Sequence, residues 1–432
     1  MSHKGTHSHR SRPLPTRHLP ARVTTHPADK HHIIPLDVVV QDATEGTTQA
    51  EGTAVASTSE ETEEVTLVAE KRWQHEPMIL LAIDMPLTLV RQATQAGFKI
   101  IQLVTLKNLG INIAKIRVEG PEQEKKIRAW LKERGVHFVT YNDFYVLNQG
   151  SMLHQFEENF PWGMLGWPYP CPDCGKGIKI GIVDTNVDMD IPVLSSSKVV
   201  EHAFTQLTNH VQNRHGTAIS AILVGDCNGE FCGLLPEASL YVAVAFKPYK
   251  ESPKATALSI AKGLDWLLGE GVEVINLSFC GPDNPLLRQA IDRTLKKGIP
   301  VVAAAGNYGD KAPKVYPAGY DGVIAVTAVD KFGRPFPEAN HGDYISFSDP
   351  GVRVPVPDRH DRLHFRSGTS YASAYCTAIV AVLTANSEGP ADIAGIVEKM
   401  KNDAIDLGRP GKDEIFGWGL ARCGEECKTA WK

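Results

Sequence analysis

Four short segments of this chain carry the side chains that hydrolysis of a peptide bond by a serine requires. IKIGIVD ends on Asp184, RHGTAIS carries His215, VVAAAGN ends on Asn307, and RSGTSYASA carries Ser370. Such a reaction needs a nucleophile, a base that takes its proton, a carboxylate that orients the base, and hydrogen-bond donors for the oxyanion. Together the four residues supply all of these groups.

The positions of these residues along the chain favour the same chemistry. Asp184 and Asn307 follow apolar strands, whereas His215 and Ser370 open helices. At a helix start, the backbone N–H of Ser370 and the helix dipole lie beside a developing negative charge. Each residue alone is more often a cap or a turn residue. Their common placement predicts a catalytic triad of Asp184, His215 and Ser370, with Asn307 and the Ser370 N–H as the oxyanion hole.

Apolar strands alternate with helical segments from residue 176 onward. The expected strands are IKIGIVD, SLYVAVAF, VEVINLSF, IPVVAAAGN and GVIAVTAVD, and the expected helices follow His215 and run from Thr256 to Leu268 and from Asn284 to Lys297. Strands that are apolar throughout are typical of a parallel sheet covered on both faces. Ligands bind at the carboxyl ends of such strands, which is where the four residues fall.

A smaller α+β domain is expected before this region, over residues 67–148. Strands are predicted at 78–84, 99–105, 111–118 and 136–141, with helices that begin at Pro86 and Pro121 and end before Gly97 and Gly135. The order β-α-β-β-α-β indicates one sheet with two helices on one face. Residues 1–66 are polar and predicted to be disordered, and 149–175 are predicted to be a connector to a peptidase domain at 176–432.

These motifs resemble the subtilisin-like serine peptidases, from about Gly177 to Leu383. IVDTNVD resembles the aspartate segment of that family, HGTAISAILVG the histidine segment, VVAAAGN the oxyanion segment and SGTSYASA the serine segment. The resemblance implies an endopeptidase that hydrolyses polypeptide substrates through an acyl-enzyme on Ser370 and requires no cofactor. It also implies that residues 67–148 are a propeptide, which acts as an intramolecular inhibitor until it is cut off.

The resemblance also assigns the residues that bind substrate. Ser278, Phe279 and Cys280 correspond to the strand end that pairs with an extended substrate, and Ala304, Ala305 and Gly306 to the opposite wall of the primary specificity pocket. In this mode main-chain hydrogen bonds hold any extended peptide, and side-chain pockets select among peptides. The alternative is that these six residues are simply buried strand ends, and for Ala304 the two interpretations hold together.

The chain departs from the family pattern at several positions. Asn186 replaces a glycine, which predicts a positive φ there because asparagine tolerates that conformation. Ala374 replaces a proline, and Ser373 and Cys376 lie in the same helix. The loop GDCNGEFCG is shorter than the calcium loop of many relatives, which puts calcium at that site in doubt.

Two other functions use the same residues. A peptide ligase or cyclase would form the same acyl-enzyme, and an inactive scaffold would bind peptides without cleaving them. The net charge of −5 gives no electrostatic case for nucleic acid, and no apolar run is long enough to span a bilayer. The seven histidines before residue 33 are typical of a solvated tail rather than of a metal site.

The spacing of the cysteines is evidence on whether the protein works in an oxidising or a reducing compartment. Six of the eight form local pairs, namely Cys171/Cys174, Cys227/Cys232 and Cys423/Cys427. We expect local disulfides and an exported protein, although the first residues contain no apolar signal-peptide core. The alternatives are reduced thiols in a cytoplasmic protein, or four thiolates of the first and last pairs around one zinc ion.

Overall fold

The computed structural model describes residues 74–147, 160–205, 214–249, 252–360, 362–387, 389 and 391–425. All of them belong to one compact unit, Ile33–Lys432. The expected disorder of residues 1–66 lies outside the described residues, as does Cys427. Within the described part of the chain, no helix has both the length and the apolar character needed to cross a membrane.

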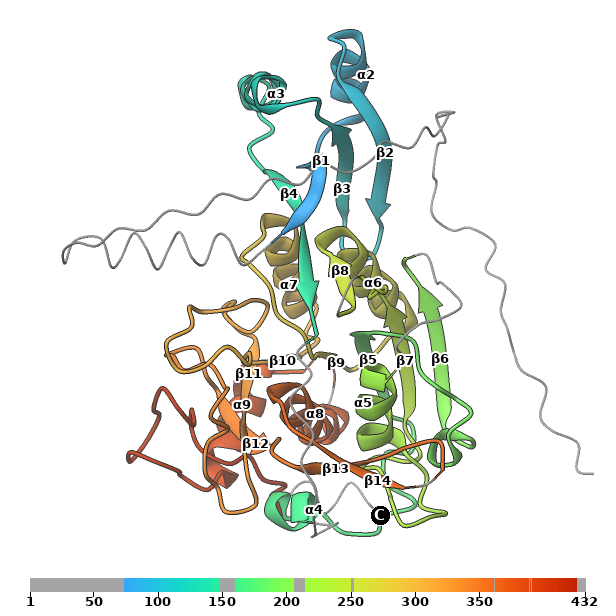
Figure 1. Ribbon diagram of the computed structural model, residues 1–432, viewed down its shortest axis with the longest axis vertical. Coiled ribbons are helices and arrows are strands. Elements are labelled where there is room, and N and C mark those ends of the chain that lie inside the picture. Colours follow the sequence, from blue (N-terminus) through green and yellow to red (C-terminus); the bar gives the residue numbers. More distant parts are fainter. Residues whose placement is uncertain are drawn as a thin grey trace, which may run out of the picture. The chain divides into compact units, whose positions relative to one another are not determined.

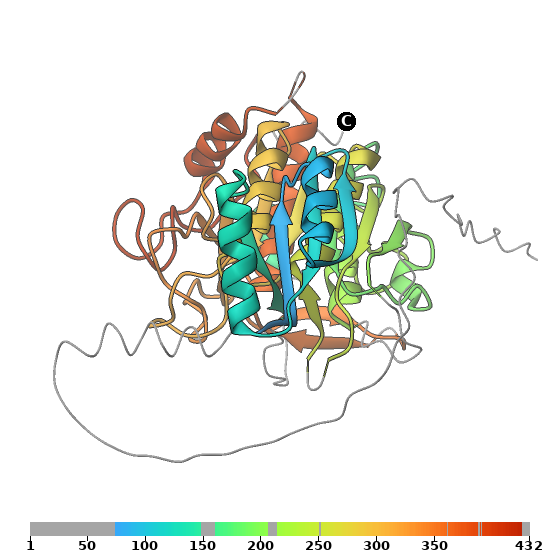
Figure 2. The same cartoon turned by 90° about the horizontal axis from the view of Figure 1, so that it is seen from above.

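The first described region is a small antiparallel α+β domain. Its elements are β1 (His75–Ile83), α2 (Leu87–Gln95), β2 (Lys99–Leu106), β3 (Ile111–Arg117), α3 (Pro121–Glu133) and β4 (Val139–Val146). The strand order is β2-β3-β1-β4, and β1 pairs antiparallel with both β3 and β4. Both helices cover the same face of this sheet (Figure 2). The order β-α-β-β-α-β is therefore the predicted one.

Alternation of side chains along β1 explains how this sheet is buried on both faces. Leu80 and Ala82 pack against Ile127 and Leu131 of α3. Leu81 and Ile83 point to the opposite face and join a core formed with α6 (Ala257–Glu270) and α7 (Pro285–Lys296) of the following region. The helix-free face of the small sheet is therefore covered by the peptidase region.

The last strand of this small domain is longer than its sequence pattern predicts. The pattern VHFVTY predicts an end at Tyr141, whereas β4 continues to Val146. Beyond Asp143 it pairs antiparallel with β8 (Lys254–Thr256), in the register Phe144↔Thr256 and Tyr145↔Ala255. A partner more than 100 residues away thus supplies the hydrogen bonds that extend this strand, which no local pattern records.

The second region contains a parallel sheet of seven strands in the order β12-β11-β10-β9-β5-β7-β6 (Figure 1). The strands are β5 (Lys179–Asp184), β6 (Lys198–Ala203), β7 (Ser239–Val244), β9 (Val274–Leu277), β10 (Val301–Ala304), β11 (Ile324–Val329) and β12 (Phe347–Pro350). Every pairing between neighbouring strands is parallel. This is the predicted α/β fold.

Helices cover both faces of the seven-stranded sheet. One face packs on α5 (Arg214–Val224) and α8 (Thr369–Ala385), and the other packs on α6 (Ala257–Glu270) and α7 (Pro285–Lys296). The hairpin β13 (Val354–Pro357) and β14 (Leu363–Arg366) lies before α8, and α9 (Ile393–Asp403) follows it. Because both faces are buried, the strands are apolar at nearly every position.

Side-chain caps define where α6 and α7 begin. The Thr256 side chain accepts a hydrogen bond from the backbone N–H of Ser259, and the Ser259 hydroxyl accepts one from the backbone N–H of Thr256. Asn284 accepts hydrogen bonds from the N–H groups of Leu286 and Leu287, and Pro285 occupies the first helical position. These caps satisfy backbone donors that the first turn leaves open, so both helices start where the sequence predicts.

Part of the predicted connector belongs to the peptidase core. Residues Phe160–Leu165 form the short helix α4. Trp162, Leu165 and Trp167 are buried in the same core as α5 and α8. The aromatic residues of this segment, which indicated only a linker in the sequence, thus add apolar area to the main domain.

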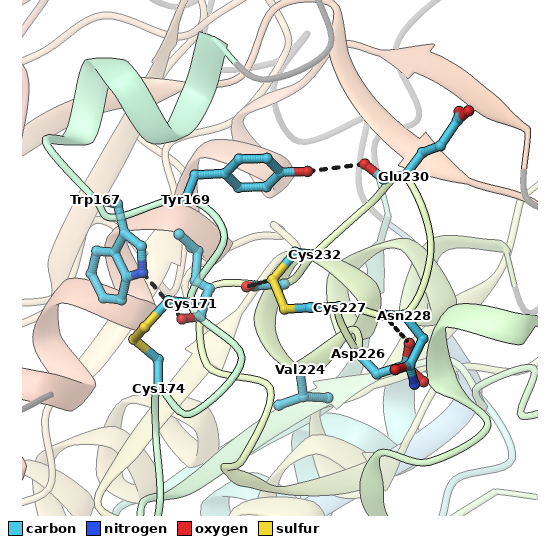
Figure 3. Close-up of a disulfide and its surroundings, with 12 residues drawn as sticks. Trp167, Tyr169, Cys171, Cys174, Val224, Asp226, Cys227, Asn228, Glu230 and Cys232 are labelled. Atoms are coloured by element: carbon cyan, nitrogen blue, oxygen red, sulfur yellow. Dashed lines mark hydrogen bonds between the residues drawn. A yellow bond between two sulfur atoms is a disulfide. The ribbon is translucent and has the colours of Figure 1, made fainter.

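Two of the predicted disulfides are formed, and they lie in neighbouring segments (Figure 3). Cys171 is bonded to Cys174, and Cys227 to Cys232, with Cα–Cα distances of 5.5 and 4.3 Å. Tyr169 donates a hydrogen bond of 2.9 Å to the carbonyl of Glu230, which lies inside the second disulfide loop. The predicted pair Cys423/Cys427 lies partly outside the described residues.

Replacing Cys227 and Cys232 by alanine is expected to lower the free energy of unfolding by about 2 kcal/mol. The effect is modest because the disulfide closes only a short loop and so removes little conformational entropy from the unfolded chain. Denaturant unfolding of the variant and of wild type measures this difference. Mass spectrometry of native, alkylated, unreduced protein checks the bond itself. Alkylation of both thiols in that sample contradicts the disulfide.

Candidate active site

Asp184 is the last residue of β5 and is completely buried. One of its carboxylate oxygens accepts the N–H of Thr185 at 2.7 Å. Both oxygens lie 2.9 Å from Nδ1 of His215. Since a carboxylate only accepts hydrogen bonds, Nδ1 must carry the proton. Asp184 therefore fixes the orientation of the imidazole ring.

His215 lies in the first turn of α5, where the helix faces the carboxyl end of β5. With Nδ1 protonated, Nε2 of a neutral ring is a free base. Nε2 is buried and has no hydrogen-bond partner among the described residues. The first turn of α5 lies so close to Thr185 that a Cβ at Gly216 would be 2.6 Å from the carbonyl oxygen of Thr185. Glycine is therefore required at this position.

Ser370 is the second residue of α8 and is 2% exposed. Its Oγ donates a hydrogen bond of 3.0 Å to the carbonyl oxygen of Ser278, which follows β9. The hydroxyl is therefore not bonded to His215 in this conformation. Rotation about the Cα–Cβ bond redirects Oγ, and catalytic hydrogen bonds often tighten only when substrate is bound.

The side-chain amide of Asn307 is held by one end only. Its Oδ1 accepts hydrogen bonds from the backbone N–H of Thr369 at 3.0 Å and from the Thr369 hydroxyl at 2.8 Å. Its Nδ2 is buried and has no partner among the described residues. An amide whose oxygen is fixed and whose NH₂ group is unused is preorganised to donate to an anion. Thr369 was not predicted as a site residue, although it lies in the motif RSGTSYASA.

The residues expected to bind substrate line the ends of β9 and β10. Ser278 connects β9 to α8, because its hydroxyl lies 3.1 Å from the carbonyl of Ser370 and 2.9 Å from the hydroxyl of Ser373. Phe279 is buried edge-on against Tyr145. Ala304 and Ala305 are buried, and the N–H of Gly306 donates to the Thr369 hydroxyl at 3.2 Å.

The backbone of Cys280 is paired with the end of the small domain. The N–H of Val146 donates to the carbonyl of Cys280 at 3.1 Å, and the N–H of Cys280 donates back at 3.2 Å. Val146 therefore occupies the strand edge that was predicted to receive substrate. Because it also pairs with β8, this segment lies between two strands of the peptidase region.

Tyr145 anchors this segment, and the sequence analysis did not identify it. Its ring is completely buried, and its hydroxyl donates to the carbonyl of Pro282 at 3.0 Å. A Cβ at Gly281 would lie 2.2 Å from the ring, so only glycine leaves room for it. A tyrosine at the end of an apolar strand gives no local signal of such a contact.

A turn and a helix cap add polar contacts between the small domain and the peptidase region. The N–H of Leu109, in the β2–β3 turn, donates to Asp265 of α6 at 2.8 Å, and Arg293 of α7 donates to the carbonyl of Leu109 at 2.7 Å. Asn142 accepts the N–H of Leu258 at the start of α6 at 3.0 Å. The small domain thus satisfies the backbone N–H of Leu258 and is bonded to side chains of both α6 and α7.

The departures from the family pattern leave the four reactive side chains in place. Among the described residues, the non-glycine positions with positive φ are Met78, Asp84 and Arg353. The prediction of a positive φ at Asn186 is therefore wrong, and the backbone there does not require glycine. Cys376 is buried beside the buried carboxyl group of Asp349; burial holds the pKa of that carboxyl well above its usual range.

The loop GDCNGEFCG, where the family resemblance raised the question of calcium, is closed by the Cys227–Cys232 disulfide. Asp226 at its start accepts the Ser196 hydroxyl at 2.6 Å and the N–H of Asn228 at 3.1 Å. Across the residues that the structure describes, no group of three histidine, cysteine, aspartate or glutamate side chains is placed to hold a metal ion.

A parallel sheet with an aspartate, a histidine, an amide and a serine at its carboxyl edge has the architecture of a subtilisin-like serine peptidase. Residues 175–419 match the model of the subtilase family. Because this match covers more than half of the sequence, the chain belongs to the subtilase family.

Individual relatives agree with this assignment. The minor extracellular protease Epr of Bacillus subtilis is 29% identical over 299 residues, which cover 67% of this chain and 45% of Epr. Subtilisin DY of Bacillus licheniformis is 33% identical over 217 residues, which cover 48% of this chain and 77% of that protein. The chain thus spans less than half the length of Epr.

Among solved structures, fervidolysin from Fervidobacterium pennivorans superposes with a TM-score of 0.68 at 20% identity. The superposition covers 81% of this chain and 60% of fervidolysin. At this identity the likeness is evidence for the fold alone.

Proposed function

We propose that this chain is a serine endopeptidase in which Ser370 attacks the scissile carbonyl and His215 takes its proton. Asp184 keeps Nδ1 of His215 protonated and stabilises the imidazolium that forms. The Nδ2 group of Asn307 and the N–H of Ser370 donate to the oxyanion. The unused, buried Nδ2 of Asn307, fixed through Thr369, is the observation that carries this proposal best.

Each step of this reaction uses an atom that the fold leaves available. Nε2 of His215 is unpaired among the described residues, so it can accept the Ser370 proton and later donate it to the leaving amine. The hydroxyl of Ser370 must leave the carbonyl of Ser278 for this to happen. Water then hydrolyses the acyl-enzyme through the same base. Labelling with a fluorophosphonate probe, lost in Ser370→Ala, tests the nucleophile.

We further propose that the small domain is an intramolecular inhibitor. Three observations support it: Val146 pairs with the backbone of Cys280, Tyr145 is buried at the same edge, and the helix-free face of the small sheet is covered by the α6 and α7 region. A segment that occupies the substrate edge excludes other peptides from it. The likeness to fervidolysin also covers more of this chain than residues 176–432 alone could supply.

Self-processing is the expected consequence, because Val146 is paired with Cys280, two residues after Ser278, whose carbonyl accepts the Ser370 hydroxyl. Wild-type protein is expected to shorten by cleavage between residues 146 and 176, while Ser370→Ala stays at full mass. Intact-mass measurement of both purified proteins shows which of them has shortened, and N-terminal sequencing locates the cleavage site.

Ser387→Ala, at the far end of α8, is a matched control that is expected to shorten like wild type. Equal masses for wild type and Ser370→Ala would contradict self-processing and leave the assignment of the nucleophile standing.

We also propose that the protein works outside the cytoplasm. Two disulfides in one small region suit an oxidising compartment, and Epr is named an extracellular protease. The test is the redox state of Cys171, Cys174, Cys227 and Cys232 in protein isolated from its native source.

A further inference from the structure

A cavity of about 540 Å³ lies beside the candidate catalytic residues, between α5 and the hairpin β13–β14. Arg214, which precedes His215, lines it from α5, and Arg366, four residues before Ser370, lines it from β14. His215, the neighbour of Arg214, lies with its ring centroid 6.1 Å from that of Tyr371, although neither residue lines the cavity. The cavity is therefore adjacent to the reacting groups and separate from the β9 edge.

The position of Val146 indicates which half of a substrate this cavity receives. Val146 pairs with Cys280, which follows β9, and the carbonyl of Ser278 in the same segment accepts the Ser370 hydroxyl at 3.0 Å. A substrate bound in the same way places its acyl half on the β9 edge. Neither Cys280 nor the ends of β8 and β10 line the cavity. His215, which protonates the leaving half, follows Arg214 in the first turn of α5, so the leaving half is expected to lie along α5 and β14.

The cavity carries an excess of positive charge. Four arginines line it, together with two histidines and only two carboxylates. Asp188 pairs with Arg359, and Asp358 pairs with Arg362 at 3.0 Å and with His364 at 2.7 Å. Both carboxylates are therefore already engaged.

The carboxylate of Asp358 is firmly ionised. Burial acts to raise its pKa, but hydrogen bonds from His364 and from the backbone of His360 and Arg362 outweigh burial and hold the pKa below its ordinary value. Arg362 and His364 are thus both bonded to Asp358 within the hairpin.

Two guanidinium groups stay available. Among the described residues, no carboxylate forms an ion pair with Arg214 or Arg366, although both line the cavity. Arg366 is half-buried, which reduces the screening of its charge by water. A planar guanidinium matches a carboxylate with two parallel hydrogen bonds. Unpaired cations in a cavity next to the reacting atoms favour an anionic ligand.

We propose that this cavity selects substrates with an aspartate or glutamate side chain shortly after the scissile bond, and that Arg214 and Arg366 bind its carboxylate. The inference deepens the proposed function, because it assigns specificity to the leaving half of the same substrate. Arg214 and Arg366 are specificity residues in this scheme and take no part in bond breaking.

A peptide library from a digested proteome, cleaved by the active protein and analysed by mass spectrometry, first identifies a good substrate. Two peptides of that sequence then differ only by Glu or Gln at the enriched position on the leaving side. For wild type we expect kcat/KM to be about tenfold higher for the Glu peptide, as a charge-assisted pair provides. The ratio is expected to fall as salt rises.

The variant Arg214→Gln/Arg366→Gln is expected to bring the Glu-to-Gln ratio to within about twofold of one. Arg353→Gln is the matched control, because Arg353 lies before the same hairpin, packs on Phe365 and does not line the cavity. It is expected to keep the wild-type ratio. A further pair of peptides ends at this position, one with a free C-terminal carboxylate and one with a C-terminal amide. Their rates show whether the cavity binds a side-chain carboxylate or a terminal one.

Equal rates for the Glu and Gln peptides in wild type would overturn the inference, as would a preference that survives in the double variant. A free C-terminus preferred over the Glu side chain overturns the side-chain assignment. If wild type shows neither fluorophosphonate labelling nor any cleavage, the proposed function itself is wrong, and this inference fails with it.

Discussion

Ser370→Ala is expected to lower kcat by a factor of about 10⁴–10⁶ while the protein stays folded. The hydroxyl is the only group of this site that forms the acyl-enzyme, so its loss leaves only binding and the oxyanion donors. His215→Ala and Asp184→Ala are expected to fall in the same range, because the three residues act as a unit. Hydrolysis of a peptide substrate measures kcat, and thermal unfolding checks the fold.

Removal of the hydroxyl alone is a mild change for the structure. Among the described residues, the Ser370 hydroxyl has one hydrogen-bond partner, the carbonyl of Ser278, and the backbone carbonyl of Ser370 keeps its hydrogen bond from the Ser373 hydroxyl. Ser387→Ala at the end of α8 serves as the control and is expected to retain wild-type kcat. Activity of Ser370→Ala within tenfold of wild type would remove Ser370 from the reaction.

Asn307→Asp is expected to lower kcat by about 10²–10³ with a smaller change in KM, because an oxyanion donor acts in the transition state. The aspartate keeps an oxygen for the N–H and hydroxyl of Thr369, which Asn307 accepts at 3.0 and 2.8 Å. It replaces the buried Nδ2 donor by a second oxygen. The change therefore acts on the oxyanion while it preserves the contact that positions the side chain.

Asn307→Ala serves as the companion variant, because it removes both the donor and the contact to Thr369. The two variants are expected to lose similar kcat if donation to the oxyanion is the main role. A loss in Asn307→Ala alone, with wild-type kcat in Asn307→Asp, would instead assign Asn307 to the positioning of Thr369. Steady-state kinetics at several substrate concentrations separates kcat from KM.

Local sequence patterns determined most of the elements and the four candidate catalytic residues. The apolar runs before Asp184 and Asn307 are β5 and β10, and His215 and Ser370 lie in the first turns of α5 and α8. Thr256 and Asn284 cap the helices that they were expected to start. These features depend on hydrophobic periodicity and on backbone groups a few residues apart, so a short window of sequence contains their cause.

The tertiary structure alone decided how distant segments meet. The extension of β4 to Val146 requires hydrogen bonds from β8 and Cys280, more than 100 residues further along the chain. The burial of Tyr145 against Gly281 and the unused Nδ2 of Asn307 depend on neighbours brought together by folding. The cationic cavity likewise combines α5 with a hairpin that lies about 140 residues later. Partners of this kind are set by packing of the whole domain, and no local periodicity encodes which residue each will contact.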